Sequence, residues 1–148
     1  MCDLVIHESF FLRDDLNPEE RLQVDLGPYL ADGVLQLCEL SNDSETEMFV
    51  DLAVALDDGE AKSLAIALSR GLAVVTDDRK ARRIFVEMGG QPANLLSTAD
   101  VIRTWAGEAN ISKETLKIAL NRVQIRSRFI PRSTDPNHYW WESSADSA

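Results

Sequence analysis

The sequence predicts an α/β fold with a mostly parallel sheet, on two observations. Apolar stretches of strand length alternate with amphipathic stretches of helical period along the chain. One apolar stretch, residues 72–75, is continuous, which is typical of a strand buried on both faces of a parallel sheet. The length of 148 residues suits one domain, which we place at residues 1–130 and which is followed by a C-terminal tail at 131–148.

The individual elements follow from local patterns. The clearest helix is expected at 59–69, because its apolar residues share one stripe and Gly71 stands where glycine ends helices. Ser112 is expected to cap a later helix. The other expected elements are a short helix at 3–12 (a strand being the alternative), a strand at 34–40, a helix from about 45, the strand at 72–75, a helix at 79–88, an extended piece at 94–98, and helices at 99–105 and 112–126.

Composition excludes several classes of protein. Hydrophobic residues make up 45 % and charged residues 27 %, which argues against wholesale disorder. No apolar run approaches the roughly 20 residues that span a bilayer, and the start lacks the features of a secretory signal. Two cysteines are too few for a disulfide scaffold. We therefore expect a cytoplasmic protein with reduced thiols and no membrane partner.

The charge is unevenly divided between the two parts of the chain. The net charge is −10, but residues 1–60 carry 16 acids and 2 bases, whereas residues 61–148 carry 9 acids and 13 bases. An acidic protein is a poor generic binder of nucleic acid. The division has two interpretations: one part binds a metal and the other a polyanion, or the two parts attract each other and leave solvated faces outside.

Carboxylates gather where the buried strand is expected to end. Asp77 and Asp78 follow residues 72–75 directly, and Glu60 stands in the first turn of the clearest helix. One of the two Asp residues would serve as a helix N-cap, and the helix dipole would favour an acid at Glu60. These residues therefore also have a structural explanation. Gathered at strand ends, however, carboxylates are what Mg²⁺ or Mn²⁺ needs, and such a site can activate water against a phosphodiester.

Residues 56–68 contain Asp-Gly-Glu-Ala followed by Leu-Ala-Ile-Ala, and residues 71–83 form an apolar strand, Thr-Asp-Asp and a basic Arg-Lys-Ala-Arg-Arg helix. Over about residues 34–105 this arrangement resembles the PIN-domain family of the prokaryotic toxin–antitoxin type. The resemblance implies a three-layer α/β/α fold and RNA cleavage with Mg²⁺ or Mn²⁺ held by three or four acids. By position, it implies Glu60 and Asp77 as catalytic residues and metal ligands, with Asp78 and Glu8 as further ligands.

The chain departs from that family at its start. PIN domains begin with an apolar strand that ends in an Asp, whereas here Asp3 precedes the apolar residues Leu4 to Ile6. The expected fold is therefore N-terminally incomplete. Either the true start lies upstream, or the chain is a shortened form that has lost a ligand and its central strand.

Three functions compete on these grounds. The first is a metal-dependent ribonuclease, in which basic side chains guide the RNA backbone: Arg79, Lys80, Arg82 and Arg83. The second is a PIN remnant without activity that binds an antitoxin-like protein or a second copy of the chain. The third is a phosphoacceptor domain using a strand-end Asp, for which the accompanying acidic pair and Lys are not convincingly placed.

Overall fold

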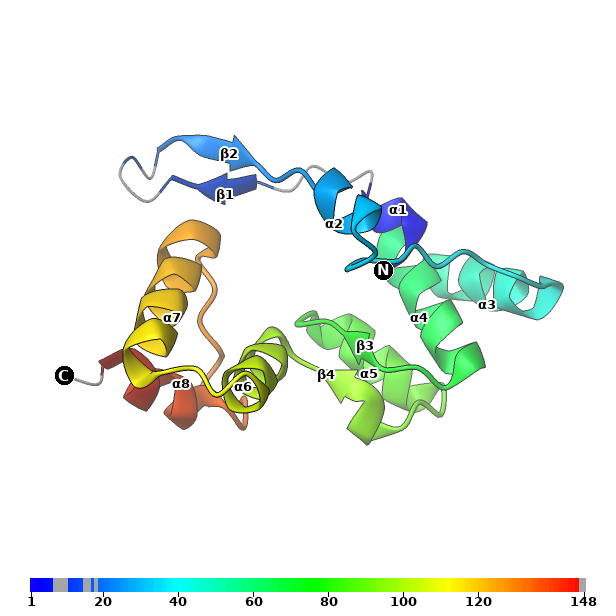
Figure 1. Ribbon diagram of the computed structural model, residues 1–148. Coiled ribbons are helices and arrows are strands. Elements are labelled where there is room, and N and C mark those ends of the chain that lie inside the picture. The colour runs from blue at the N-terminus through cyan, green and yellow to red at the C-terminus, as the bar shows by residue number, and fades with distance from the viewer. Residues whose placement is uncertain (7–10, 15–16, 18, 147–148) are drawn as a thin grey trace. The chain divides into compact units, whose positions relative to one another are not determined.

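The computed structural model describes residues 1–6, 11–14, 17 and 19–146. The chain divides into two units (Figure 1). Unit 1 comprises the described part of Met1–Ser9 together with Asp25–Ser97. Unit 2 comprises the described part of Phe10–Val24 together with Thr98–Ala148. No helix in the described ranges combines the length and the apolar character that crossing a membrane requires.

The predicted fold class is wrong. Helices account for 57 % and strands for 9 % of the structure, so neither a mostly parallel sheet nor a three-layer α/β/α arrangement is present among the described residues. The described strands form two separate two-stranded sheets, one parallel and one antiparallel. The physical reason is that an apolar stretch becomes a strand only where another segment supplies a hydrogen-bonding ladder. Local periodicity does not show whether such a partner exists. It also fails for the helix expected at 3–12, because Phe11–Arg13 form a strand.

Unit 1 is built around a long helix with short elements on either side. Its elements are α1 (Asp3–Ile6), α2 (Gly27–Ala31), α3 (Asp43–Ala53), α4 (Asp58–Arg70), β3 (Val74–Val75), α5 (Arg79–Glu87), the 3-10 helix η1 (Pro92–Asn94) and β4 (Leu95–Leu96). The core of this unit consists of apolar residues from α3, α4, β3 and α5, with Leu64, Ala65 and Phe85 almost completely buried.

Helix α4 confirms the clearest sequence prediction. The side chain of Asp57 caps it, with Oδ1 accepting a hydrogen bond from the Glu60 N–H at 2.8 Å. Gly71 ends it in the left-handed conformation, with φ of 63°, which glycine adopts without the penalty other residues incur. The buried stripe includes Ala61, Leu64 and Ala65, as the helical spacing predicts.

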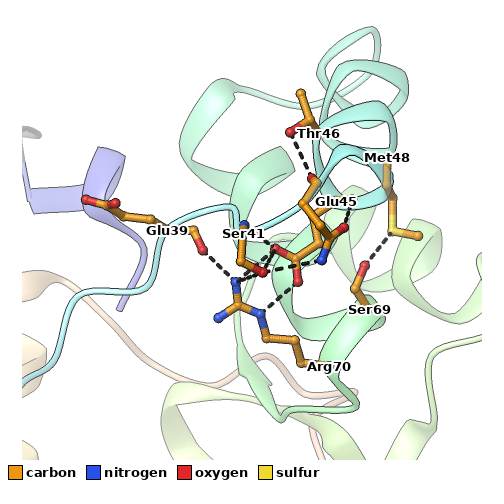
Figure 2. A network of polar contacts seen from close by, with 8 residues as sticks. Glu39, Ser41, Glu45, Thr46, Met48, Ser69 and Arg70 are labelled. Atoms are coloured by element: carbon orange, nitrogen blue, oxygen red, sulfur yellow. Dashed lines mark hydrogen bonds and ion pairs between the residues drawn. The ribbon is translucent and has the colours of Figure 1, made fainter.

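An ion pair joins the start of α3 to the end of α4 (Figure 2). Arg70 Nε donates to Glu45 Oε1 at 2.8 Å, and Arg70 Nη2 donates to Glu45 Oε2 at 2.8 Å. The Ser41 N–H also donates to Glu45 Oε2 at 2.8 Å. These donors, the Arg70 guanidinium first, lower the pKa of Glu45 from its ordinary 4.5 to about 2.

The predicted strands of unit 1 are shorter than expected or absent. The stretch 72–75 yields only β3, which pairs in parallel with β4. It is not buried on both faces, because Leu72 is 44 % and Val75 is 51 % exposed. In the stretch 34–40, the only pairing among the described residues is an isolated parallel bridge between Cys38 and Cys2. Both predicted strands are short or absent because their partners are short: β4 pairs two residues with β3, and Cys2 pairs with Cys38 through a single bridge.

Unit 2 consists of a hairpin and three helices: β1 (Phe11–Arg13), β2 (Arg21–Gln23), α6 (Thr98–Glu108), α7 (Lys113–Ser127) and α8 (His138–Asp146). Strands β1 and β2 are antiparallel, and Arg126 Nε of α7 donates to the Arg13 carbonyl at 3.1 Å. The side chain of Ser112 caps α7, as predicted. Trp141 of α8 is completely buried and packs edge-on against Phe129, with ring centroids 5.5 Å apart.

Candidate functional site

The first turn of α4 and the end of β3 line one pocket of about 220 Å³. Glu60 and Asp57 contribute from the helix start, and Val75 and Thr76 contribute from the strand end. Capping by Asp57 fixes the helix start, because its Oδ1 holds the Glu60 N–H at 2.8 Å. The structure thus brings Glu60 to the strand edge at which the sequence placed the candidate chemistry, although the sheet there has only two strands in the part of the chain that the structure describes.

Asp77 and Asp78 occupy different positions. Asp78 is the N-cap of α5, and its Oδ1 accepts hydrogen bonds from the N–H groups of Lys80 at 2.7 Å and Ala81 at 2.9 Å. Asp77 is exposed and directly follows Thr76, which lines the pocket. The structural explanation that the sequence offered for one of the two acids, a helix N-cap, therefore applies to Asp78.

The four basic residues of α5 differ in their contacts. Arg82 Nη1 donates to the carbonyls of Thr76 at 2.8 Å and Leu96 at 3.0 Å, so it ties the ends of β3 and β4 to the helix. Arg83 forms an exposed ion pair with Glu87 one turn later, with 3.6 Å between Arg83 Nε and Glu87 Oε1. Arg79 and Lys80 are exposed at the start of the helix.

Glu8, expected as a further ligand, lies outside the described residues. Among the residues that are described, no three or more His, Cys, Asp or Glu side chains gather closely enough to hold a metal ion. The candidate site consists of Glu60, which lines the pocket, and of the exposed Asp77, which follows the lining residue Thr76 in the chain. Its oxygen donors match the preference of Mg²⁺ and Mn²⁺, which bind through as few as one or two carboxylates and otherwise keep water.

Asp3 contacts α4, which no pattern in the sequence indicated. Asp3 Oδ1 lies 2.6 Å from Lys62 Nζ, and this ion pair lowers the pKa of Asp3. Lys62 stands two positions after Glu60 on the same helix. The available signal was the position of Asp3 at the first turn of a short helix, which does not reveal a contact nearly sixty residues away in sequence.

A second, more apolar pocket of about 400 Å³ lies beside α4 further along the helix, at Ser63, Ile66 and Ala67. Ile66 and Ala67 of α4 and Val74 and Val75 of β3 contribute to it, together with Met1, Cys2, Cys38, Ser63, Leu72 and Ala73. Strand β3 therefore borders both pockets, and its edge away from β4 has no partner strand among the described residues.

In comparisons with known proteins, no family model matches the chain, and neither a curated protein nor a solved structure matches it.

Proposed function

We propose that this chain is a metal-dependent endoribonuclease of the cytoplasm that hydrolyses RNA phosphodiester bonds with Mg²⁺ or Mn²⁺. The observation that supports the proposal is the pocket shared by Glu60 and the end of β3. It agrees with the resemblance of residues 56–83 to the helix and strand end that carry acids in PIN domains. We assign Glu60 and Asp77 as the catalytic acids, with Asp78 and Glu8 as further candidate ligands.

The electrostatics of the pocket edge support cation binding. Glu60 and Asp57 both line the pocket, so two carboxylate side chains stand at its helical side. Asp57 Oδ1 accepts the hydrogen bond of the Glu60 N–H, so this cap already counters part of the positive charge at the start of the α4 dipole, which would otherwise oppose a cation. A hard cation needs oxygen donors of this kind and completes its coordination with water and substrate phosphate.

The roles of the chain's own residues follow from their positions. Glu60, which lines the pocket, and Asp77, which directly follows the lining residue Thr76, supply negative charge to the cation, whereas Arg79 and Lys80 offer positive charge to the RNA backbone. Arg82 is not assigned to RNA, because its guanidinium bonds two backbone carbonyls. When bound, the ion supplies a water of lowered pKa and positive charge for the leaving oxygen.

The experiment is cleavage of a labelled single-stranded RNA by the full chain in Mn²⁺, compared with the same reaction in a chelator. We expect Glu60→Gln and Asp77→Asn each to reduce the Mn²⁺-dependent rate at least about 100-fold. Asp58→Asn is the matched control, because Asp58 is also a first-turn acid of α4 but does not line the pocket. Wild-type cleavage by either site variant would overturn the assignment of that residue.

A protein-interaction module is the second candidate function. It is favoured by the apolar pocket of about 400 Å³ beside β3 and by the exposed side chains of Leu72 and Val75. The partner would be an antitoxin-like protein or a second copy of the chain. Sedimentation distinguishes the two functions: a chain that self-associates and shows no response to Mn²⁺ supports this candidate, and a monomer that cleaves RNA in Mn²⁺ rejects it.

A further inference from the structure

The two cysteines of the chain are direct partners across a parallel bridge. The Cys38 N–H donates to the Met1 carbonyl at 2.8 Å, and the Asp3 N–H donates to the Cys38 carbonyl at 3.3 Å, so Cys2 stands opposite Cys38. Adjacent extended segments lie about 4.8 Å apart. A disulfide requires a Cα separation of about 4.4–6.8 Å. The backbone pairing therefore meets the Cα separation that an S–S bond requires.

Both residues also line the same pocket, the apolar one of about 400 Å³. Cys2 is buried, with 5 % of its surface exposed, whereas Cys38 is partly exposed. Both are free thiols in the structure. A small reagent that enters the pocket thus meets Cys38 as the more accessible thiol and Cys2 as the neighbour that can complete a second step.

We propose that Cys2 and Cys38 form a reversible modification site that a low-molecular-weight disulfide, such as oxidised glutathione, converts into an intramolecular cross-link. The Cys38 thiolate attacks one sulfur of the small disulfide, whose S–S bond breaks and releases one thiolate. The Cys2 thiolate then attacks Cys38 Sγ, and the mixed disulfide breaks to release the second. Two electrons pass from the protein thiols to the small disulfide, which leaves as two thiols carrying the two protons.

The cross-link has a defined structural effect. It joins the first residues of the chain to the extended segment around residue 38, at the wall of the pocket that β3 also borders. Cross-linking two residues that far apart in sequence restricts the unfolded chain, so the oxidised protein is expected to melt at a higher temperature than the reduced one. The inference does not depend on nuclease activity, because it concerns only the bridge and its pocket.

The test starts from the full chain, reduced and then incubated with oxidised glutathione without oxygen. Free thiols are alkylated before the intact mass is recorded. We expect two alkyl groups on the reduced protein and none after oxidation, with the oxidised mass about 2 Da below that of the reduced chain before alkylation. Two alkylated thiols after oxidation, a persistent glutathione adduct, or a disulfide-linked dimer would each overturn the proposal.

Single-cysteine variants identify the order of attack. Cys2→Ser should accumulate the glutathione adduct on Cys38, because the second step is then blocked. Cys38→Ser should react with oxidised glutathione at least about tenfold more slowly, because Cys2 is buried. Equal rates in the two variants would contradict Cys38 as the first nucleophile.

A comparison with the unfolded chain tests whether the fold itself brings the thiols together. The ratio of cross-linked to reduced protein is measured at equilibrium in one glutathione buffer, with and without concentrated urea. We expect the native chain to favour the cross-link by about tenfold or more. Equal ratios would show that the fold does not hold Cys2 and Cys38 in position, and would contradict the proposal even if some cross-link forms.

Discussion

Arg70, the last residue of α4, binds both carboxylate oxygens of Glu45 at the start of α3, with two hydrogen bonds of 2.8 Å. Glu45 is only 2 % exposed, so its carboxylate is shielded from water. Hydrogen bonds from its partners must compensate for this lost solvation. The bidentate geometry is the strong form of the Arg–carboxylate pair. It fixes the start of α3 against the end of the helix that carries Glu60 (Figure 2).

This pair predicts a specific acid sensitivity. The folded protein holds the pKa of Glu45 at about 2, below its ordinary 4.5, so below about pH 5 the unfolded state binds more protons at this residue than the folded state. The contribution of the pair is therefore complete above that range and is lost as the pH falls towards 2. We expect Glu45→Gln to lower the Tm at pH 7 and to flatten its dependence on pH between about 5 and 2.

Thermal unfolding followed by circular dichroism from pH 7 to pH 2.5 measures both effects. Glu47→Gln is the control, since Glu47 lies on the same helix and is exposed; its effect should stay within about 0.5 kcal/mol. A Gln variant at residue 45 with the Tm and the pH slope of the wild type would contradict the role given to the ion pair.

A second prediction separates Arg82 from its basic neighbours. Arg82→Met keeps most of the side-chain length but removes the two hydrogen bonds to the carbonyls of Thr76 and Leu96. We expect a loss of about 1–3 kcal/mol in the free energy of unfolding, because partly buried carbonyls lose a charged donor. Urea unfolding measures it, with the exposed Arg79→Met as the control. Equal stability of the two variants would contradict the structural role of Arg82.

A third prediction concerns two glycines. A Cβ added at Gly90 would run into the ring of Phe85, which is 1 % exposed and has little room to move. Gly90→Ala should therefore lower the free energy of unfolding by about 1–3 kcal/mol. At Gly107, near the end of α6, a Cβ meets nothing within 4 Å, so Gly107→Ala should be neutral or stabilise by up to about 1 kcal/mol. Urea titrations of both variants check the signs; a stabilising Gly90→Ala would contradict the packing described around Phe85.

Local signals in the sequence identify α4 and α7, but they did not predict α2 or α8. Asp57 and Gly71 bound α4, and Ser112 starts α7, because capping chemistry depends on residues next to each other in the chain. The sheet could not be predicted in the same way. The stretch 72–75 has the composition of a buried central strand, but strand pairing depends on distant segments, and β4 supplies a ladder of only two residues.

The candidate site was predictable to a similar extent. Glu60 was singled out because it stands in the first turn of a helix whose apolar stripe faces the core, and in the structure it lines a pocket together with the end of β3; its role as a metal ligand stays a prediction. The two adjacent acids could not be told apart, because either Asp77 or Asp78 could cap α5; the structure assigns the cap to Asp78. The Asp3–Lys62 contact and the pairing of Cys2 with Cys38 join distant segments, so no local pattern reported them.

The most direct test of the central claim is a titration of the full chain with Mn²⁺, in which electron paramagnetic resonance measures the free ion. Binding is the appropriate quantity because it does not depend on knowing the RNA target. We expect Mn²⁺ binding by the wild type and by Asp58→Asn, and at least about tenfold weaker binding by Glu60→Gln. Equal binding by Glu60→Gln and the wild type, or no binding by any of the three proteins, would contradict a metal site at the edge where α4 meets β3.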